Sequence, residues 1–192
     1  MATQKIKYIK VNLDNIDLAY NFQKKEWPNE PDYETFKNKS INGNERNINF
    51  IAYINDTPIG ITGIYEEDID PTSLWLDWFC VDKSFRGKGF GKQILLDTIE
   101  YCKQFDEINY FRIDTQLKKD RESTMLYLET MDFIEKYTIE DSEIINHGHY
   151  ICTKCLKPNI LFKPWNNRYL GLTEHYNNLK NINNTRRKNE SK

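Results

Sequence analysis

One stretch decides the fold of this chain: Val81-Asp82-Lys83-Ser84-Phe85-Arg86-Gly87-Lys88-Gly89-Phe90-Gly91-Lys92. It begins where an apolar run ends, passes through three glycines in five residues, and continues into a segment whose apolar residues recur near the helical period. Glycine adopts positive φ and lets the backbone approach a ligand closely. The first turn of a helix has N–H groups without intrahelical partners and a partial positive charge. The stretch therefore predicts a buried strand, a glycine turn and a helix that begins at once.

Two interpretations of this glycine turn remain open on the residues alone. A helix N-terminus preceded by glycines can cradle a pyrophosphate, whose charge Arg86, Lys88 and Lys92 would neutralise. The same pattern also occurs as a plain strand-to-helix turn. It is not a Walker loop, because no Ser or Thr follows the lysine in the required frame, and residues 87–91 lack the Rossmann spacing.

The rest of the chain predicts a mixed α/β fold. Apolar, β-branched runs indicate strands, and apolar residues at helical spacing indicate helices. An antiparallel meander precedes the glycine turn, with a hairpin turn at 55–58, and helices alternate with strands after it. Asp14 is the expected N-cap of the first helix. The expected strands are 4–11, 48–54, 59–65, 74–81, 110–115, 133–139 and 150–156, and the expected helices are about 16–27, 31–41, 90–102 and 121–131.

Placed between a strand and a helix, the glycine turn resembles motif A of the GNAT acetyltransferase superfamily. The chain is expected to be a bacterial member of this superfamily. The motif reads Arg or Gln, two residues, Gly, one residue, then Gly or Ala, and it is matched by Arg86, Gly89 and Gly91. The resemblance implies an α/β fold with a central, mostly antiparallel, splayed sheet flanked by helices, over residues 1–156. Residues 157–192 are then a C-terminal extension, expected to dock in part and to fray towards its end.

The resemblance also implies acetyl-CoA as cosubstrate. Backbone amides from Arg86 to Gly91 would bind its pyrophosphate, and residues 79–81 would pair with its pantetheine arm. The expected acetyl-CoA contacts are Phe79, Cys80, Val81, Arg86, Gly87, Lys88, Gly89, Phe90, Gly91 and Lys92.

The second family motif is matched less well. On the helix before Phe133 the family often has a Tyr whose hydroxyl protonates the departing thiolate, and this sequence has Leu128 there. Tyr127 lies one position earlier, about 100° around the helix. Tyr127 is thus either the thiolate acid or a packed helix aromatic. Arg121 stands where the family often has Asn.

Transfer to an amine requires a base, because an alkylamine with a pKa of about 10.4 is protonated at neutral pH. By strand alternation Trp75, Asp77 and Phe79 share one face, and Asp77 is the only carboxylate among them. Partial desolvation there would raise the pKa of Asp77. Asp77 is the predicted base, and a structural Asp paired with a local Arg or Lys is the alternative. Glu66, in the acidic loop 66–70, is a second candidate base or a solvated loop residue.

A cluster of His147, His149, Cys152 and Cys155 contains four potential metal ligands. Strand alternation points Cys152 away from the other three. Structural zinc sites usually take their second ligand pair from a distant segment. No metal site is expected.

Composition narrows the class of protein. The chain has 192 residues, 39 % of them hydrophobic and 29 % charged, with a formal charge of −2, as in soluble globular proteins. The charge gives no reason to expect a nucleic-acid partner or an acidic membrane surface. No signal peptide, bilayer-spanning run or disulfide framework is recognised, so a cytoplasmic location is expected.

The expected function is an acetyl-CoA-dependent N-acetyltransferase that acts on a primary amine of a small molecule, an amino acid or an antibiotic-like compound. A protein N-terminus or lysine is the alternative acceptor. A non-catalytic acyl-CoA-binding module and a zinc-binding interaction protein are the alternatives from other classes. A homodimer is possible, because many GNAT proteins dimerise.

Overall fold

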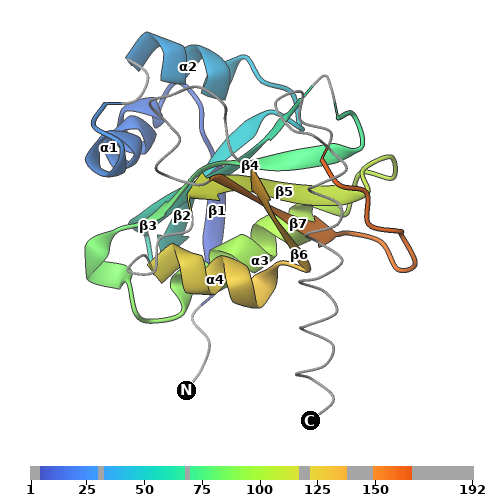
Figure 1. The fold of residues 1–192 in the computed structure, drawn as a ribbon. Helices are drawn as coiled ribbons and strands as arrows, with labels where there is room; N and C mark the ends of the chain where they lie inside the picture. The colour runs from blue at the N-terminus through green and yellow to red at the C-terminus, as the bar shows by residue number, and fades with distance from the viewer. Residues whose placement is uncertain (1–4, 30–32, 68–69, 117–121, 138–148, 166–192) are drawn as a thin grey trace. The chain divides into compact units, whose positions relative to one another are not determined.

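The computed structural model describes residues 5–29, 33–67, 70–116, 122–137 and 149–165. The chain divides into unit 1, residues 1–66 with 74–104, and unit 2, residues 67–73 with 105–192. Figure 1 labels the helices and strands of both units. Within the described ranges, no helix combines the length and the apolarity that a membrane span requires.

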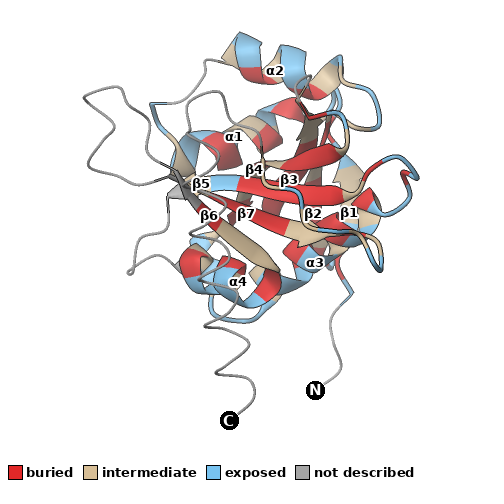
Figure 2. Ribbon diagram, turned by 45° about the vertical axis from the view of Figure 1, so that its right-hand side comes forward, coloured by how far each residue is buried: buried red, intermediate tan, exposed pale blue. Residues whose placement is uncertain are grey.

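Unit 1 is built on an antiparallel meander in which each strand pairs with the next along the chain. Strand β3, which pairs with β2 and β4, is buried along its middle (Figure 2). The elements are β1 (Lys7–Lys10), α1 (Ile16–Glu26), α2 (Tyr33–Ile41), β2 (Ile48–Ile54), β3 (Thr57–Glu66), β4 (Ser73–Val81), a 3-10 turn (Lys83–Phe85) and α3 (Phe90–Cys102).

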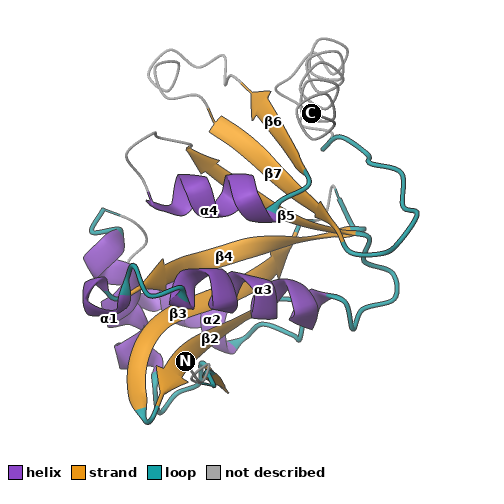
Figure 3. Cartoon of the chain, turned by 90° about the horizontal axis from the view of Figure 1, so that it is seen from below, coloured by secondary structure: helices purple, strands orange, loops and turns teal. Residues whose placement is uncertain are grey.

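Helices cover the two faces of this meander (Figure 3). Ile51, Ile61 and Cys80 of the strands pack with Phe22 of α1 and Phe36 of α2. We call this side the α1/α2 face. A second cluster joins Ala52, Ile59 and Val81 to Ile94 of α3, and this side is the α3 face. The strands thus separate two apolar layers, as the alternation of their sequence predicts.

Two local predictions in unit 1 need correction. The β2–β3 turn has two residues, Asn55 and Asp56, with φ of 46° and 64°, rather than the predicted four. This left-handed geometry matches the twist of a tight hairpin, and Asn and Asp tolerate it. The residue at the cap position of α1 is Asn15 instead of Asp14, and its amide donates to the Lys10 carbonyl.

Unit 2 contains a three-stranded antiparallel sheet in the order β5-β7-β6. Its elements are β5 (Tyr110–Gln116), α4 (Glu122–Thr130), β6 (Phe133–Tyr137) and β7 (His149–Cys155). The predicted elements of this region are confirmed to within a few residues. Residues 138–148, which include the predicted end of the β6 strand and His147, lie outside the described residues.

A buried ionic network holds unit 2 together around Arg112 of β5. The Arg112 guanidinium is 1 % exposed and donates to Asp70 at 3.0 Å, to Thr153 at 2.8 Å and to Ser73 at 2.9 Å. It also lies 3.6 Å from the carboxylate of Glu135. Each buried charge therefore has partners, as burial demands.

The start of the predicted extension docks on unit 2. Tyr110 donates to the carbonyl of Leu161 at 2.6 Å, and Arg112 donates to that of Lys163 at 2.9 Å. The rings of Phe162 and Phe133 are stacked with their centres 4.0 Å apart. Residues 166–192 lie outside the described residues, so the remaining part of the prediction for 157–192 stays a prediction.

Glu135 gives unit 2 an expected pH dependence. Burial raises the pKa of Glu135 from 4.5 to about 7, against the opposing effect of Arg112. The folded state therefore holds the proton of Glu135 more tightly than the unfolded chain does. Proton binding by Glu135 stabilises the fold fully below pH 4.5, and this stabilisation is lost as the pH rises to about 7. Between pH 7.5 and pH 5 we expect a gain on the order of 1–3 kcal/mol that Glu135→Gln lacks. Hydrogen exchange of β6 and β7 amides checks this, and an equal gain in both proteins would contradict it.

Candidate active site

The glycine turn has the geometry that its sequence predicts. β4 ends at Val81, and α3 begins at Phe90. Gly87 has a φ of 71° and Gly89 a φ of 83°, both in the left-handed region that disfavours residues with a Cβ. Gly89 is also the N-cap of α3, and its carbonyl accepts from the Gln93 N–H at 3.1 Å. The two glycines thus bring the chain from the strand end directly into the helix.

Open space lies where side chains at these glycines would stand. Within the described residues, no atom beyond the chain neighbours lies within 4 Å of a Cβ built on Gly87 or on Gly89. The first turn of α3, Phe90-Gly91-Lys92-Gln93, carries a lysine and no carboxylate. The N–H groups of residues 90–92 precede the first hydrogen bond of the helix, which Gln93 donates to Gly89, and they bear the partial positive charge of the helix N-terminus. The turn therefore fits an anionic group such as a pyrophosphate.

Two side chains predicted to neutralise that anion make contacts within unit 1. Arg86 donates to the Val81 carbonyl at 2.8 Å and to the Glu26 carboxylate at 2.6 Å. Lys88 donates to the Ser84 carbonyl at 2.8 Å. Arg86 thus ties the turn to the end of β4 and to α1. In the structure the Arg86 guanidinium holds the loop in place, and its role in neutralising the charge of a pyrophosphate stays a prediction.

β4 contains a β-bulge just before the glycine turn. Gly63 of β3 pairs with Asp77, whereas Ile61, two residues earlier, pairs with Cys80, three residues later. Cys80 packs on the α1/α2 face, and Phe79 packs against the cluster of the α3 face. The prediction that Phe79 shares a face with Asp77 is wrong, because a bulge inserts one residue and breaks strict alternation.

Asp77 is a buried carboxylate on the α1/α2 face. The residue is 8 % exposed, its Oδ2 accepts from the Asn49 amide at 3.2 Å, and its Oδ1 lies 3.7 Å from Lys39 Nζ. Burial raises the pKa of Asp77, while the Lys39 ammonium and the Asn49 amide oppose that rise. A raised pKa is the property that a general base needs. The alternative, a structural Asp paired with a local Arg or Lys, also has its partner here, because Lys39 lies beside Asp77.

Asn49 and Gly63 position Asp77, and neither was predicted to belong to the site. Asn49 belongs to β2, two strands away from Asp77 of β4, and its side chain crosses over Gly63 of β3. A Cβ on Gly63 would lie 1.9 Å from Asn49 Oδ1 and 2.7 Å from the Ile48 carbonyl oxygen. Only glycine leaves room for this crossing. The available signal was a single Asn within the apolar run 48–54.

Gly63→Ala should therefore destabilise the protein by about 1–3 kcal/mol, because the added methyl overpacks the site and displaces Asn49. Denaturant unfolding measures the loss. In an Asn49→Ala background the closest clash disappears, so the same change should cost less there. Equal costs in the two backgrounds would contradict the proposed crossing, since residues in contact show coupling.

The other two predicted catalytic residues lie in different surroundings. The Glu66 carboxylate accepts from Arg46 at 3.0 Å and from the Asn47 amide at 3.3 Å, so it joins the ends of β2 and β3. Tyr127 is 6 % exposed on α4 of unit 2, and Leu128 is 37 % exposed. Glu66 is thus the last residue of β3 and is ion-paired, instead of the solvated loop residue that was the predicted alternative, and its role as a base stays a prediction. The role of Tyr127 as thiolate acid stays a prediction.

The cysteines of the His147–Cys155 cluster lie on a strand, as the sequence predicts. Cys152 is buried and Cys155 half-buried on β7, an odd number of residues apart and hence on opposite faces. The Cys155 N–H donates to the Asp132 carboxylate at 3.0 Å. Across the described ranges, which omit His147, no group of three or more His, Cys, Asp or Glu residues is placed to hold a metal ion.

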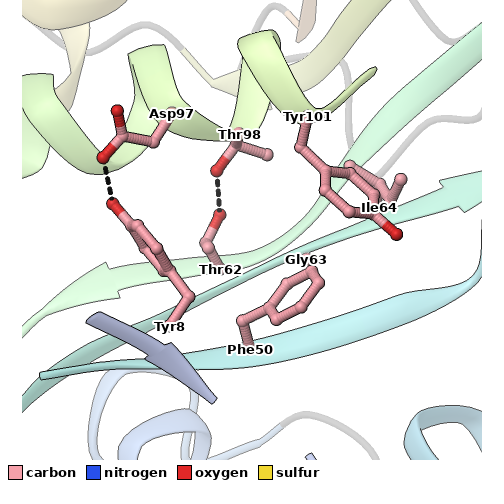
Figure 4. A pocket seen from close by; sticks show the side chains of 8 residues that line it. All are labelled: Tyr8, Phe50, Thr62, Gly63, Ile64, Asp97, Thr98 and Tyr101. Carbon is pink, nitrogen blue, oxygen red and sulfur yellow. Dashed lines mark hydrogen bonds between the residues drawn. The ribbon is translucent and has the colours of Figure 1, made fainter. Parts of the chain in front are cut away.

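A separate cavity of about 120 Å³ lies on the α3 face of unit 1 (Figure 4). Four of its polar side chains form two pairs: Tyr8 donates to Asp97 at 2.6 Å, and the Thr62 and Thr98 hydroxyls are 2.9 Å apart. Burial and the Asp97 carboxylate raise the pKa of Tyr8. Because Asp77 faces α2, this cavity is not part of its surroundings.

A strand with a bulge that leads into a phosphate-fitting glycine turn and a helix is the arrangement that the sequence resemblance implied for a CoA-dependent acyl-transfer protein. The sequence model of the acetyltransferase (GNAT) family matches residues 12–133, more than half of the chain. The chain belongs to this family. It is therefore an acyltransferase, and acetyl-CoA is its cosubstrate. The predicted fold class is confirmed.

Solved structures share the fold at low sequence identity. An acetyltransferase of GNAT family from Staphylococcus aureus and a Bacillus subtilis acetyltransferase in complex with CoA are each 20 % identical to the chain. In both comparisons the TM-score is 0.58, and 80 % of this chain and 100 % of the other are covered. A spermidine N-acetyltransferase chimera from Vibrio cholerae is 16 % identical, with a TM-score of 0.62 and coverages of 80 % and 96 %. No curated protein sequence matches the chain.

Proposed function

We propose that this chain transfers an acetyl group from acetyl-CoA to a primary amine of a small molecule, with Asp77 as the general base. Amino acids and antibiotic-like amines belong to the proposed acceptor class. The observation that carries the proposal is a buried carboxylate beside the β4 bulge, on the strand that leads into the glycine turn. We propose a cytoplasmic, bacterial enzyme.

The glycine turn is the proposed site of the acetyl-CoA pyrophosphate. The open space at Gly87 and Gly89 admits the phosphates, and the amides of Gly89 to Lys92 lie at the N-terminus of α3. Residues 79–81, past the bulge, are the proposed backbone partners of the pantetheine arm. The oxyanion donor is proposed to be a backbone N–H on this strand, near the β4 bulge.

Asp77 supplies the proton transfer that amine acetylation requires. A protonated alkylamine cannot attack a thioester, and freeing it at neutral pH costs about 4–5 kcal/mol. Asp77 accepts that proton directly or through water while the nitrogen bonds to the carbonyl carbon. The carbon–sulfur bond then breaks, and the leaving CoA thiolate takes up the second proton, which the nitrogen loses as the amide forms. Asn49 holds the carboxylate in place during these steps.

Two buried polar groups support an acceptor on the α1/α2 face. The amide of Gln23 on α1 and the indole N–H of Trp78 have no hydrogen-bond partner among the described residues. Trp78 follows Asp77 directly, and its ring lies 5.4 Å from that of Trp27 at the end of α1. Unpaired buried polar groups cost about 1–3 kcal/mol each, which a bound ligand or water relieves.

The alternative expected from the sequence is a non-catalytic acyl-CoA-binding module, and it rests on Leu128, which stands where the family often has the thiolate acid. Membership in a family of acetyltransferases weighs against this alternative. A protein N-terminus or lysine stays the alternative acceptor for a catalytic chain.

The test is mass spectrometry of products formed from acetyl-CoA and a panel of amino acids, polyamines, aminoglycosides and short peptides. We expect one class of small amines to gain an acetyl group. Acetylation of peptides alone would replace the small-molecule acceptor. Binding of acetyl-CoA without any acetylated product would favour the binding module.

A further inference from the structure

Lys39 reaches the candidate base from the solvent side. Its side chain is 48 % exposed on α2, whereas that of Asp77 is 9 % exposed. Lys39 Nζ lies 3.7 Å from Asp77 Oδ1 and 4.7 Å from the centre of the Tyr65 ring. An ammonium group of the protein itself is thus held between a buried carboxylate and an aromatic face.

These surroundings are built for an ammonium group. A carboxylate supplies an ion pair, and an aromatic face adds a cation–π attraction. Trp75 extends the aromatic wall, with its ring centre 6.3 Å from that of Tyr65. Asn49 donates to Asp77 Oδ2, so the two carboxylate oxygens have separate partners. We call Tyr65, Trp75 and Asp77 the ammonium subsite.

We propose that Lys39 is a built-in competitor of the acceptor: its ammonium occupies the subsite into which the ammonium of the acceptor binds. This inference rests on the proposed function, in which Asp77 is the base. The half-exposed Lys39 side chain turns into solvent when an acceptor replaces it. The occupant also shows the chemistry that fits, a primary ammonium on an unbranched alkyl chain. Lys39 thereby determines specificity, since an acceptor must bind more tightly than the lysine that it displaces.

Removing the competitor should strengthen binding of an alkylamine. Lys39→Met keeps an unbranched side chain and removes the charge. The free energy of an exposed ion pair and a cation–π contact together corresponds to a change of about five- to tenfold in affinity. Lys37→Met is the matched control, because Lys37 is on the same helix and lies over the ring of Tyr33 at 5.7 Å, outside the subsite.

The experiment is isothermal titration of n-butylamine, with n-butanol as the uncharged probe, into wild type, Lys39→Met and Lys37→Met without acetyl-CoA. We expect n-butylamine to bind Lys39→Met about five- to tenfold more tightly than wild type and Lys37→Met, with no such gain for n-butanol. Adding Asp77→Asn to Lys39→Met should abolish the gain.

Equal or weaker binding of n-butylamine to Lys39→Met would overturn the inference, as would a gain that persists without the Asp77 charge. The proposed function fails by a different result. Absence of acetyl transfer to every amine would reject that function, whereas this comparison is read from binding alone.

Discussion

Asp77→Asn should lower kcat for amine acetylation by about 10²- to 10⁴-fold, the range expected when a general base is removed. Asn keeps the size of the side chain but cannot accept the proton of the attacking amine. The KM for acetyl-CoA should stay within about twofold, because Asp77 faces α2, away from the glycine turn. Steady-state kinetics give kcat when the acceptor is varied at saturating acetyl-CoA, and give the KM for acetyl-CoA when acetyl-CoA is varied at saturating acceptor.

Glu66→Gln is the control for this prediction, since Glu66 is the other carboxylate proposed as base. Its contacts with Arg46 and Asn47 give it a structural setting, so its kcat should stay close to that of wild type. A large loss of kcat in Glu66→Gln with little loss in Asp77→Asn would reverse the assignment.

The pH dependence of the rate tests the same base. Because the pKa of Asp77 is raised, the fall of the wild-type rate at acidic pH should disappear in Asp77→Asn.

Gly89→Val should weaken acetyl-CoA binding by at least about 100-fold, because it acts on the backbone and on the ligand space together. At a φ of 83° a β-branched residue strains the turn by about 1–3 kcal/mol. Its side chain would also project into the open space beside Gly89. Equilibrium dialysis with acetyl-CoA measures the affinity, and thermal unfolding measures the strain.

Gly89→Asn separates these two causes. Asn tolerates the left-handed conformation far better than Val, so the stability of this variant should stay near that of wild type. Its side chain still enters the space assigned to the phosphates, so acetyl-CoA binding should remain weak. Affinity like that of wild type in Gly89→Asn would show that the phosphates lie elsewhere.

The order of the elements was predictable because each depends on short-range chemistry. The glycines at 87–91 and the apolar period after them indicated α3, and the β-branched runs indicated β2 and β3. The errors arose where one residue changes the geometry. The hairpin turn closes at Asn55 and Asp56 because both tolerate positive φ. The β4 bulge moves Phe79 to the face opposite Asp77, and no alternation pattern reveals an inserted residue.

The surroundings of Asp77 depend on pairing between strands, which a single sequence does not display. The sequence indicated a carboxylate on β4 but not the residues that hold it. Asn49 reaches Asp77 only because Gly63 stands between them in register, and Lys39 arrives from a helix. The same limit applies to Arg112 and Glu135, whose charges meet across strands of unit 2.

The most direct test of the central claim is the rate at which free CoA thiol is released from acetyl-CoA with and without a primary amine. Thiol release should depend on the amine, continue over many turnovers and exceed the signal of the protein's own four cysteines. Acetyl-CoA that binds but releases thiol no faster with any amine, peptides included, than without one would contradict the claim.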